Sequence, residues 1–326
     1  MARHFLIDTD TASDDAVALV MAMQAPDVQI EAITVVAGNV PVDQGVQNAL
    51  YTAELCGKVV PVYRGMPAPL TRPLETGQFA HGQDGMGDIG LPLSGRKPAS
   101  RNAIQALCET IRRFSGEITL VALGPLTNLA VALRLDPSLA SAVSECIIMG
   151  GTGRGPGNIT PVAEFNFWVD PEAARIVFES GLPIKMVGWD VTRRHGAFSP
   201  QDLAALRAVD TPLARFCVDI QQAMARFVLT RTGHPDFDLP DPMAMAIALD
   251  PSVATRSEYC FVAIETVSAL CRGQSVVDPR GRLGHEPNAE VVREASRDRF
   301  LRILTDAIKG GGRADSQFAP GAAREC

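Results

Sequence analysis

Short apolar runs alternate along the chain with longer stretches in which apolar residues recur every three or four positions. The apolar runs predict β-strands over 4–8, 29–38, 59–63, 118–124, 145–151 and 183–190. The stretches between them predict helices over 14–24, 42–56, 103–114, 126–135 and 170–180. Strands that alternate with helices and are apolar on both faces indicate a mostly parallel sheet covered on both sides.

The second half of the chain continues this pattern with different proportions. Residues 200–250 are mostly helical in pattern, 257–295 predict β-structure, and 294–308 predict a closing helix. We find no internal repeat and no linker, so we expect one α/β domain over residues 1–310, with a Rossmann-like open sheet flanked by helices. The Gly-, Ala- and polar-rich residues 311–326 predict a disordered tail.

Composition and charge narrow the class of protein. The 326 residues are 46% hydrophobic and 21% charged, which is ordinary for a globular protein. The net charge of −7 argues against binding to nucleic acid or to an anionic membrane surface. The sequence holds seven cysteines without a Cys-x-x-Cys pair, and it has neither a signal peptide nor an apolar run of about 20 residues. These features predict a cytoplasmic protein with reduced thiols.

The stretch LIDTDTASDDAVAL (6–19) places four carboxylates, Asp8, Asp10, Asp14 and Asp15, where a strand ends and a helix begins. Helix capping and the helix dipole explain one or two acidic residues at such a junction, but not four. Carboxylates this close repel one another unless a cation or protons offset the charge. Oxygen ligands suit Ca²⁺ or Mg²⁺ better than Zn²⁺, so we favour a metal site.

Two other acidic motifs fit less well. An EF-hand loop needs a further acidic or amide residue and a glycine where Ala12 and Ser13 stand. A phosphatase of the haloacid dehalogenase type also begins with a strand and D-x-D, but it leaves the Asp14–Asp15 pair unexplained. It remains a weaker alternative.

Further motifs are spread over most of the chain. They are VAGNV (36–40), ALGPLTNLAVAL (122–133), MGGTGRGPGNITPVAEFNFWVDPEAARIV (149–177), GWDVTRR (188–194) and DPMAMAIALDP (241–251). Together with DTDTASDDAVAL, in this order and spacing, they resemble the nucleoside hydrolases of the inosine–uridine-preferring type. The family's mostly parallel α/β sheet agrees with the fold that the apolar pattern predicts.

The resemblance implies Ca²⁺-dependent hydrolysis of the N-glycosidic bond of ribonucleosides, giving free base and ribose, in nucleoside salvage. It implies that Ca²⁺ is held by Asp10, Asp15, Asp241 and the backbone carbonyl of Leu123. Asp10 would also be the general base. The implied ribose-binding residues are Asp14, Asn39, Met149, Asn158, Glu164 and Asn166. The family also implies a homodimer or a homotetramer.

The pattern departs from the family beside the late aspartate. Many relatives have a histidine there, as a candidate acid for the leaving base, whereas this chain has Pro240. The remaining candidates for that role are His81, which matches a position near the base in relatives, then His234, Arg231 and Arg226. The departure leaves open a modified ribosyl substrate, or a nucleoside-binding protein that has lost turnover.

Several of these residues also fit structural roles. Asn39 and Asn158 follow glycines and suit ordinary turns, and Glu164 and Asn166 alternate with apolar residues as in a half-exposed strand. Other polar and aromatic residues we expect to be purely structural. Asp136, Asp170 and Asp250 precede prolines and predict helix caps, and the core is expected to take Phe165, Phe167, Trp168 and Trp189.

Overall fold

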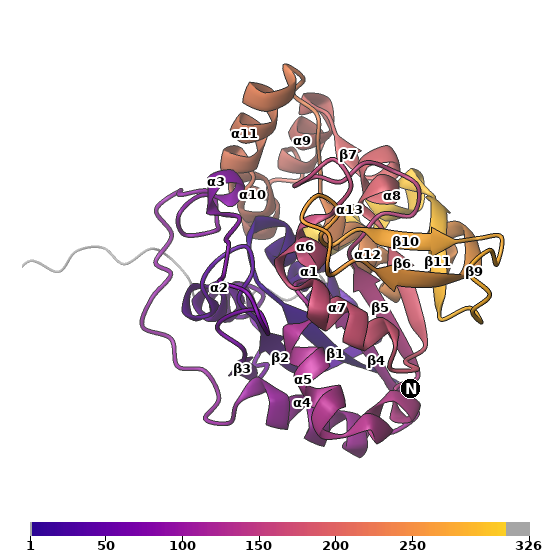
Figure 1. Ribbon diagram of the computed structural model, residues 1–326. Helices are drawn as coiled ribbons and strands as arrows, with labels where there is room; N and C mark the ends of the chain where they lie inside the picture. Colours follow the sequence, from indigo (N-terminus) through magenta and orange to yellow (C-terminus); the bar gives the residue numbers. More distant parts are fainter. Residues whose placement is uncertain (1, 311–326) are drawn as a thin grey trace, which may run out of the picture.

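A nine-stranded sheet runs through the computed structural model, which describes residues 2–310 (Figure 1). The strand order is β10-β9-β11-β6-β5-β4-β1-β2-β3. Neighbouring strands are parallel except at β9, which runs antiparallel to β10 and to β11. The strands are β1 (Arg3–Thr9), β2 (Val28–Val35), β3 (Val62–Arg64), β4 (Ile118–Ala122), β5 (Glu145–Met149), β6 (Ile184–Val187), β9 (Ala254–Ile264), β10 (Ser275–Asp278) and β11 (Ala289–Ala295). The predicted α/β fold with a mostly parallel open sheet is confirmed.

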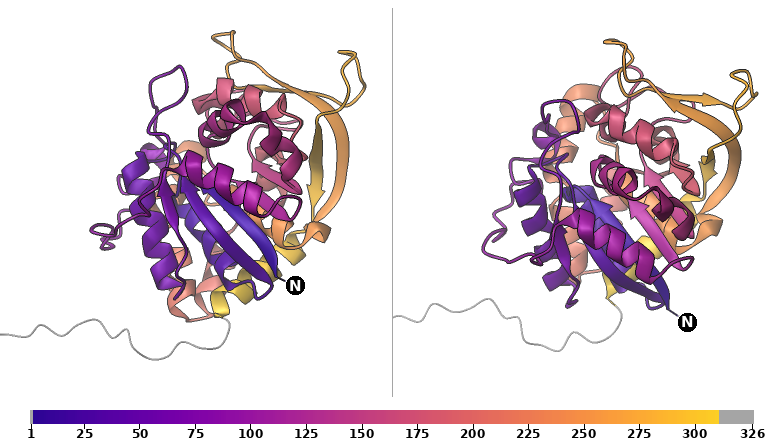
Figure 2. Two further views of the ribbon diagram at one scale, coloured as in Figure 1. Left: turned by 90° about the horizontal axis from the view of Figure 1, so that it is seen from below. Right: turned by 60° about the horizontal axis from the view of Figure 1, so that its bottom comes forward.

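Helices cover both faces of the sheet. Successive side chains of a strand point to opposite faces, and both faces carry apolar side chains that must be buried. In β1, Phe5 and Ile7 belong to one apolar layer and Leu6 to the other. The first layer is covered by α1 (Ser13–Gln24), α2 (Val42–Leu55), α10 (Pro212–Asp219), α12 (Pro240–Leu249) and α13 (Arg297–Lys309). The second is covered by α4 (Ala103–Arg113), α5 (Thr127–Leu135) and α7 (Pro171–Phe178). Figure 2 shows helices lying across the strands on either side.

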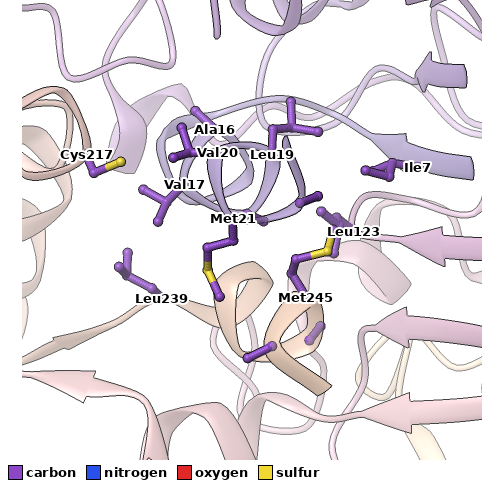
Figure 3. Close-up of a cluster of buried hydrophobic side chains, with 14 of the residues drawn as sticks. Ile7, Ala16, Val17, Leu19, Val20, Met21, Leu123, Cys217, Leu239 and Met245 are labelled. Atoms are coloured by element: carbon purple, nitrogen blue, oxygen red, sulfur yellow. The ribbon is translucent and has the colours of Figure 1, made fainter. Parts of the chain in front are cut away.

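Helices α1 and α12 lie against each other inside the first layer. Every residue of α1 except Gln24 is buried, and so is α12 from Asp241 to Ala248. Figure 3 shows Met21 of α1 and Met245 of α12 within one apolar cluster that also contains Leu123. A helix that is apolar on all sides is expected to be fully buried. The first turns of both helices are therefore held in fixed positions below the carboxyl edge of the sheet.

Smaller elements surround that edge. They are α3 (Gln78–His81), α6 (Phe165–Val169), α8 (Trp189–His195), β7 (Ala197–Phe198), α9 (Pro200–Arg207), α11 (Gln222–Thr232), β8 (Phe237–Asp238) and the 3₁₀ turns η1 (Pro137–Ala142) and η2 (Pro251–Val253). Strands β7 and β8 pair with each other as a separate two-stranded sheet. Helices α3 and α11 contact each other and lie side by side in Figure 1.

The observed elements agree with the predicted ones to within a few residues, with one exception. The stretch 163–168 is not a half-exposed strand, because Glu164 caps the short helix α6. No helix within residues 2–310 is long and apolar enough to cross a membrane, and the six cysteines in this range are free thiols. The predicted tail, 311–326, lies outside the described residues.

The three aspartates predicted as caps do begin helical turns. Asp136, Asp170 and Asp250 are the N-caps of η1, α7 and η2. Their surroundings differ. Asp136 and Asp250 bond mainly to the residues that follow them, whereas Asp170 is fully buried and accepts hydrogen bonds from three separate segments. These donors are the backbone N–H of Leu70 (2.9 Å), the hydroxyl of Thr127 (2.6 Å) and the backbone N–H of Ala173 (3.0 Å).

We predict that Asp170→Ala lowers the free energy of unfolding by roughly 3–5 kcal/mol, because it leaves buried donors without an acceptor. The matched change Asp136→Ala removes a partly exposed cap and should lower the stability much less. Urea unfolding followed by circular dichroism measures both values. Equal losses in the two variants would contradict the bridging role of Asp170.

Candidate active site

A cavity of about 270 Å³ opens at the carboxyl edge of the sheet. Parallel α/β sheets bind ligands at this edge. Among the residues that the sequence predicts for the site, the cavity is lined by Asp14, Asn39, His81, Leu123, Met149, Asn158, Glu164, Asn166 and Asp241. The structure therefore brings these residues together from α1, the loop after β2, α3, the ends of β4 and β5, the loop before α6, and the helices α6 and α12.

Asp14 and Asp241 of the acidic cluster line this cavity, whereas Asp15 and Asp10 lie buried behind its surface. Asp14, Asp15 and Asp241 each offer a carboxylate oxygen within 4.8 Å of the others, and all three are buried. Asp10 lies just beyond the end of β1 and is fully buried as well. Its Oδ2 accepts a hydrogen bond from the backbone N–H of Asn39 at 2.5 Å.

Two oxygens of this group lack a partner. Within residues 2–310, neither Oδ1 of Asp10 nor Oδ1 of Asp14 accepts a hydrogen bond, although both are buried. Asp15 differs, because it accepts from the Thr9 hydroxyl (2.5 Å) and from the backbone N–H of Ala12 (2.9 Å). Asp15 thus also caps α1. Helix capping therefore explains Asp15 but does not explain Asp10 and Asp14. A buried oxygen without a partner is costly and indicates a missing ligand.

The charges of the cluster are not balanced by the protein. Burial, reinforced by the neighbouring carboxylates, raises the pKa of Asp10 and of Asp241 well above its usual value. Burial also raises the pKa of Asp14 and of Asp15 to about 6. Keeping these carboxylates charged side by side is therefore unfavourable unless a cation or protons offset their repulsion. A set of buried carboxylate oxygens without sulfur fits a hard divalent cation.

The polar residues of the opposite wall hold one another in place. Glu164 accepts from the backbone N–H groups of Gly151 (2.8 Å) and Asn166 (2.8 Å), and Oδ1 of Asn158 accepts from the backbone N–H of Phe165 at 2.9 Å. The amide of Asn166 donates to the carbonyl of Leu123 at 2.7 Å. Because each side chain is fixed by the backbone, the wall is arranged before any ligand binds.

Gly38 lets the backbone approach the cluster closely. A Cβ atom at this position would lie 2.1 Å from Oδ2 of Asp10. Any side chain at position 38 would therefore displace Asp10 or the Asn39 backbone that bonds to it. Asn39 fits a turn, as its sequence allows, and also lines the cavity.

The predicted histidines have different surroundings. His81 is buried, with Nδ1 2.9 Å from the Ser13 hydroxyl and 3.7 Å from Oδ1 of Asp14. Burial lowers the pKa of His81 to about 4, so the ring is neutral at pH 7. His234 is exposed in the turn after α11 and does not line the cavity. The structure does not bring His234 to the site, because residues 233–236 form an exposed turn.

Helix α11 and helix α8 supply residues that the sequence analysis missed or placed elsewhere. Phe165 is buried, as expected for a core residue, and also lines the cavity. Trp189 packs partly buried against the core and lines the cavity as well, whereas Phe167 is fully buried. Arg231 lines the cavity and Arg226 does not. Other residues lining the cavity are Phe79, Arg193, Met224, Phe227, Val228, Asp238 and Pro240.

One sequence signal could have revealed the contribution of α11. Met224, Phe227, Val228 and Arg231 are spaced as one face of a helix, yet no residue of α11 is buried. A face of this kind that is not buried in the core indicates contact with a cavity or a ligand.

Comparison with known proteins identifies the family. The sequence model for the inosine-uridine preferring nucleoside hydrolases matches residues 5–302. The chain belongs to this family. Nucleoside hydrolases are N-ribosylhydrolases, and the reaction of this chain is the hydrolysis of ribonucleosides to free base and ribose.

Relatives of this nucleoside hydrolase differ in the bases that their names give. The pyrimidine-specific ribonucleoside hydrolase RihA of Salmonella schwarzengrund (strain CVM19633) is 35% identical over 95% of this chain and 99% of its own length. The plant nucleoside hydrolase PpNRh1 is 32% identical, with a TM-score of 0.90 over 95% of this chain and 100% of that one. A purine-preferring ribonucleoside hydrolase from Gardnerella vaginalis is 28% identical, with a TM-score of 0.87 over 94% and 98%.

We predict that a divalent cation stabilises this nucleoside hydrolase, and more so at pH 7.5 than at pH 5. The raised pKa values mean that the metal-free fold binds more protons than the unfolded chain, so its stability falls as pH rises from about 4 through about 6. A cation replaces those protons. At a cation concentration 100 times the dissociation constant, binding adds about 2.7 kcal/mol to the free energy of unfolding.

Thermal unfolding with and without added Ca²⁺ or Mg²⁺ measures this effect at both pH values. Asp241→Asn should remove most of the stabilisation, because it deletes one carboxylate of the cluster. The control Asp27→Asn makes the same change at an exposed position and should keep it. Stabilisation that is independent of pH, or that survives in Asp241→Asn, would argue against a cation at the cluster.

Proposed function

We propose that this nucleoside hydrolase depends on Ca²⁺ held by Asp10, Asp15, Asp241 and the carbonyl of Leu123. The observation that supports this most strongly is the buried, partnerless Oδ1 of Asp10, whose carboxyl group interacts electrostatically with those of Asp14, Asp15 and Asp241. Ca²⁺ takes about 6–8 oxygen ligands in flexible geometry, whereas Mg²⁺ retains several waters and binds through fewer carboxylates. A site this rich in carboxylates therefore favours Ca²⁺. The Leu123 carbonyl has a second lone pair besides the one that Asn166 occupies.

Asp10 is the proposed general base. The backbone N–H of Asn39 fixes its Oδ2, and its Oδ1 remains available to accept a proton from the attacking water. Bound Ca²⁺ would lower the pKa of that water and orient it. General bases typically accelerate such steps by 10²–10⁴.

The ribose is the proposed occupant of the cavity floor. Cleavage of the N-glycosidic bond builds positive charge on the sugar, and the buried carboxyl groups of Asp14 and Glu164 favour that charge when they are ionised. Asn39, Asn158 and Asn166 offer amide donors and acceptors that match vicinal hydroxyls. Met149 packs beside them as an apolar surface. His81 contacts Asp14 and is proposed to lie near the base, and its neutral ring suits a hydrogen bond rather than ion pairing.

We also infer a cytoplasmic enzyme of nucleoside salvage that forms a homodimer or a homotetramer. The free thiols of the described residues support a reducing compartment. The negative net charge argues against nucleic acid as a partner. The family resemblance supports the oligomer.

We predict that Asp10→Asn lowers kcat by at least 10²-fold while the protein stays folded, because an amide cannot accept the proton. Ribose release from a panel of ribonucleosides measures activity, and circular dichroism measures folding. Asp27→Asn is again the matched control and should be fully active. Near-full activity of Asp10→Asn would show that another group is the base. Tight nucleoside binding without turnover in the unaltered protein would instead favour a binding protein.

A further inference from the structure

Asp238 lies in the cavity wall, outside the acidic cluster. It belongs to β8, where Asp238 pairs with Ala197 and Phe237 pairs with Phe198 of β7. This pairing fixes its backbone. The carboxylates of the cluster come instead from β1, α1 and α12. The proposed roles in metal and ribose binding leave Asp238 without a function, although it lines the same cavity.

The carboxylate of Asp238 has weak support from the protein. Its Oδ2 accepts a hydrogen bond of 3.3 Å from the Thr192 hydroxyl, and within residues 2–310 it forms no ion pair. Burial raises the pKa of Asp238 to about 6, while the charge of Arg193 opposes that rise. Asp238 is therefore mostly ionised at pH 7 and keeps unused capacity as an acceptor.

The surfaces around Asp238 suit a flat heterocycle. Trp189 and Arg193 line the cavity from α8, the helix that also provides Thr192. Phe227 lines it from α11, which packs near β8. Aromatic faces and an Arg guanidinium stack on planar rings, and polar groups at their edge then select the orientation. A carboxylate at that edge can only accept hydrogen bonds, so it selects ring substituents that donate them.

We propose that Asp238 recognises the nucleobase by accepting a hydrogen bond from an exocyclic amino group. The enzyme would then favour guanine over hypoxanthine and cytosine over uracil. Hypoxanthine has only a ring hydrogen where guanine has its amino group, and uracil has an oxo group where cytosine has its amino group. An oxo group facing Asp238 would place two acceptors against each other, which repels the wrong base. This inference rests on the proposed function, in which the cavity binds a ribonucleoside.

The test compares two pairs of substrates, guanosine with inosine and cytidine with uridine. Guanosine differs from inosine only in its amino group. In Asp238→Asn, the kcat/KM of the amino-bearing nucleoside divided by that of its partner should fall about tenfold or more for at least one pair, because the amide can also donate. The change should appear mainly in KM. Using the ratio removes the intrinsic difference between leaving groups.

Asp236→Asn is the matched control, because it makes the same change two residues away at an exposed position and should leave both ratios unchanged. Ratios in Asp238→Asn that stay within twofold of the unaltered enzyme would overturn the assignment. Absence of turnover for all nucleosides in the unaltered enzyme would instead contradict the proposed function.

A second measurement covers the case in which Asp238→Asn does not fold. In the unaltered enzyme, cytosine should inhibit competitively at a concentration at least tenfold lower than uracil, or guanine at one at least tenfold lower than hypoxanthine. Equal inhibition within both pairs of bases would overturn the proposed recognition by Asp238.

Discussion

The mutual repulsion of buried carboxylates is the constraint on which this site depends. Asp10, Asp14, Asp15 and Asp241 are withdrawn from water, and burial raises the pKa of each. Such an arrangement persists only where the surrounding fold is rigid. Here α1 and α12 are buried on all sides and packed against each other, so their first turns cannot move apart to relieve the repulsion. The folded chain therefore favours binding of a cation between these carboxylates, whereas the unfolded chain does not hold them together.

The side chains at the two ends of the cavity are held in place to different extents. At the floor, Glu164, Asn158 and Asn166 are bonded to backbone groups, and a ribose would meet donors and acceptors already in position. Towards α11, the lining changes to aromatic and Arg side chains on a helix without buried residues. This contrast agrees with relatives that share a reaction but carry names with different base preferences. In the proposed function, the fixed floor binds the constant sugar and the outer wall contacts the variable base.

Much of this could be predicted from the sequence, because the signals are local. The apolar runs gave the order of strands and helices, and Asp8 to Asp15 stand within one strand–helix junction. The N-caps Asp136, Asp170 and Asp250 likewise depend on the residues that follow them. Asp238 and Trp189 could not be predicted, because their positions at the cavity result from packing between β8, α8 and α11. Glu164 was ambiguous for a related reason: two alternating polar residues suit a strand as well as a helix cap.

The most direct test of the account is ribose release from inosine, adenosine, guanosine, uridine and cytidine before and after removal of bound metal by a chelator. Activity should disappear on chelation, return with Ca²⁺, and return weakly or not at all with Mg²⁺, because the site offers many carboxylate oxygens to a large cation. Turnover that continues unchanged in fully metal-free protein would contradict the central claim that the buried carboxylates at the end of β1 hold a catalytic metal ion.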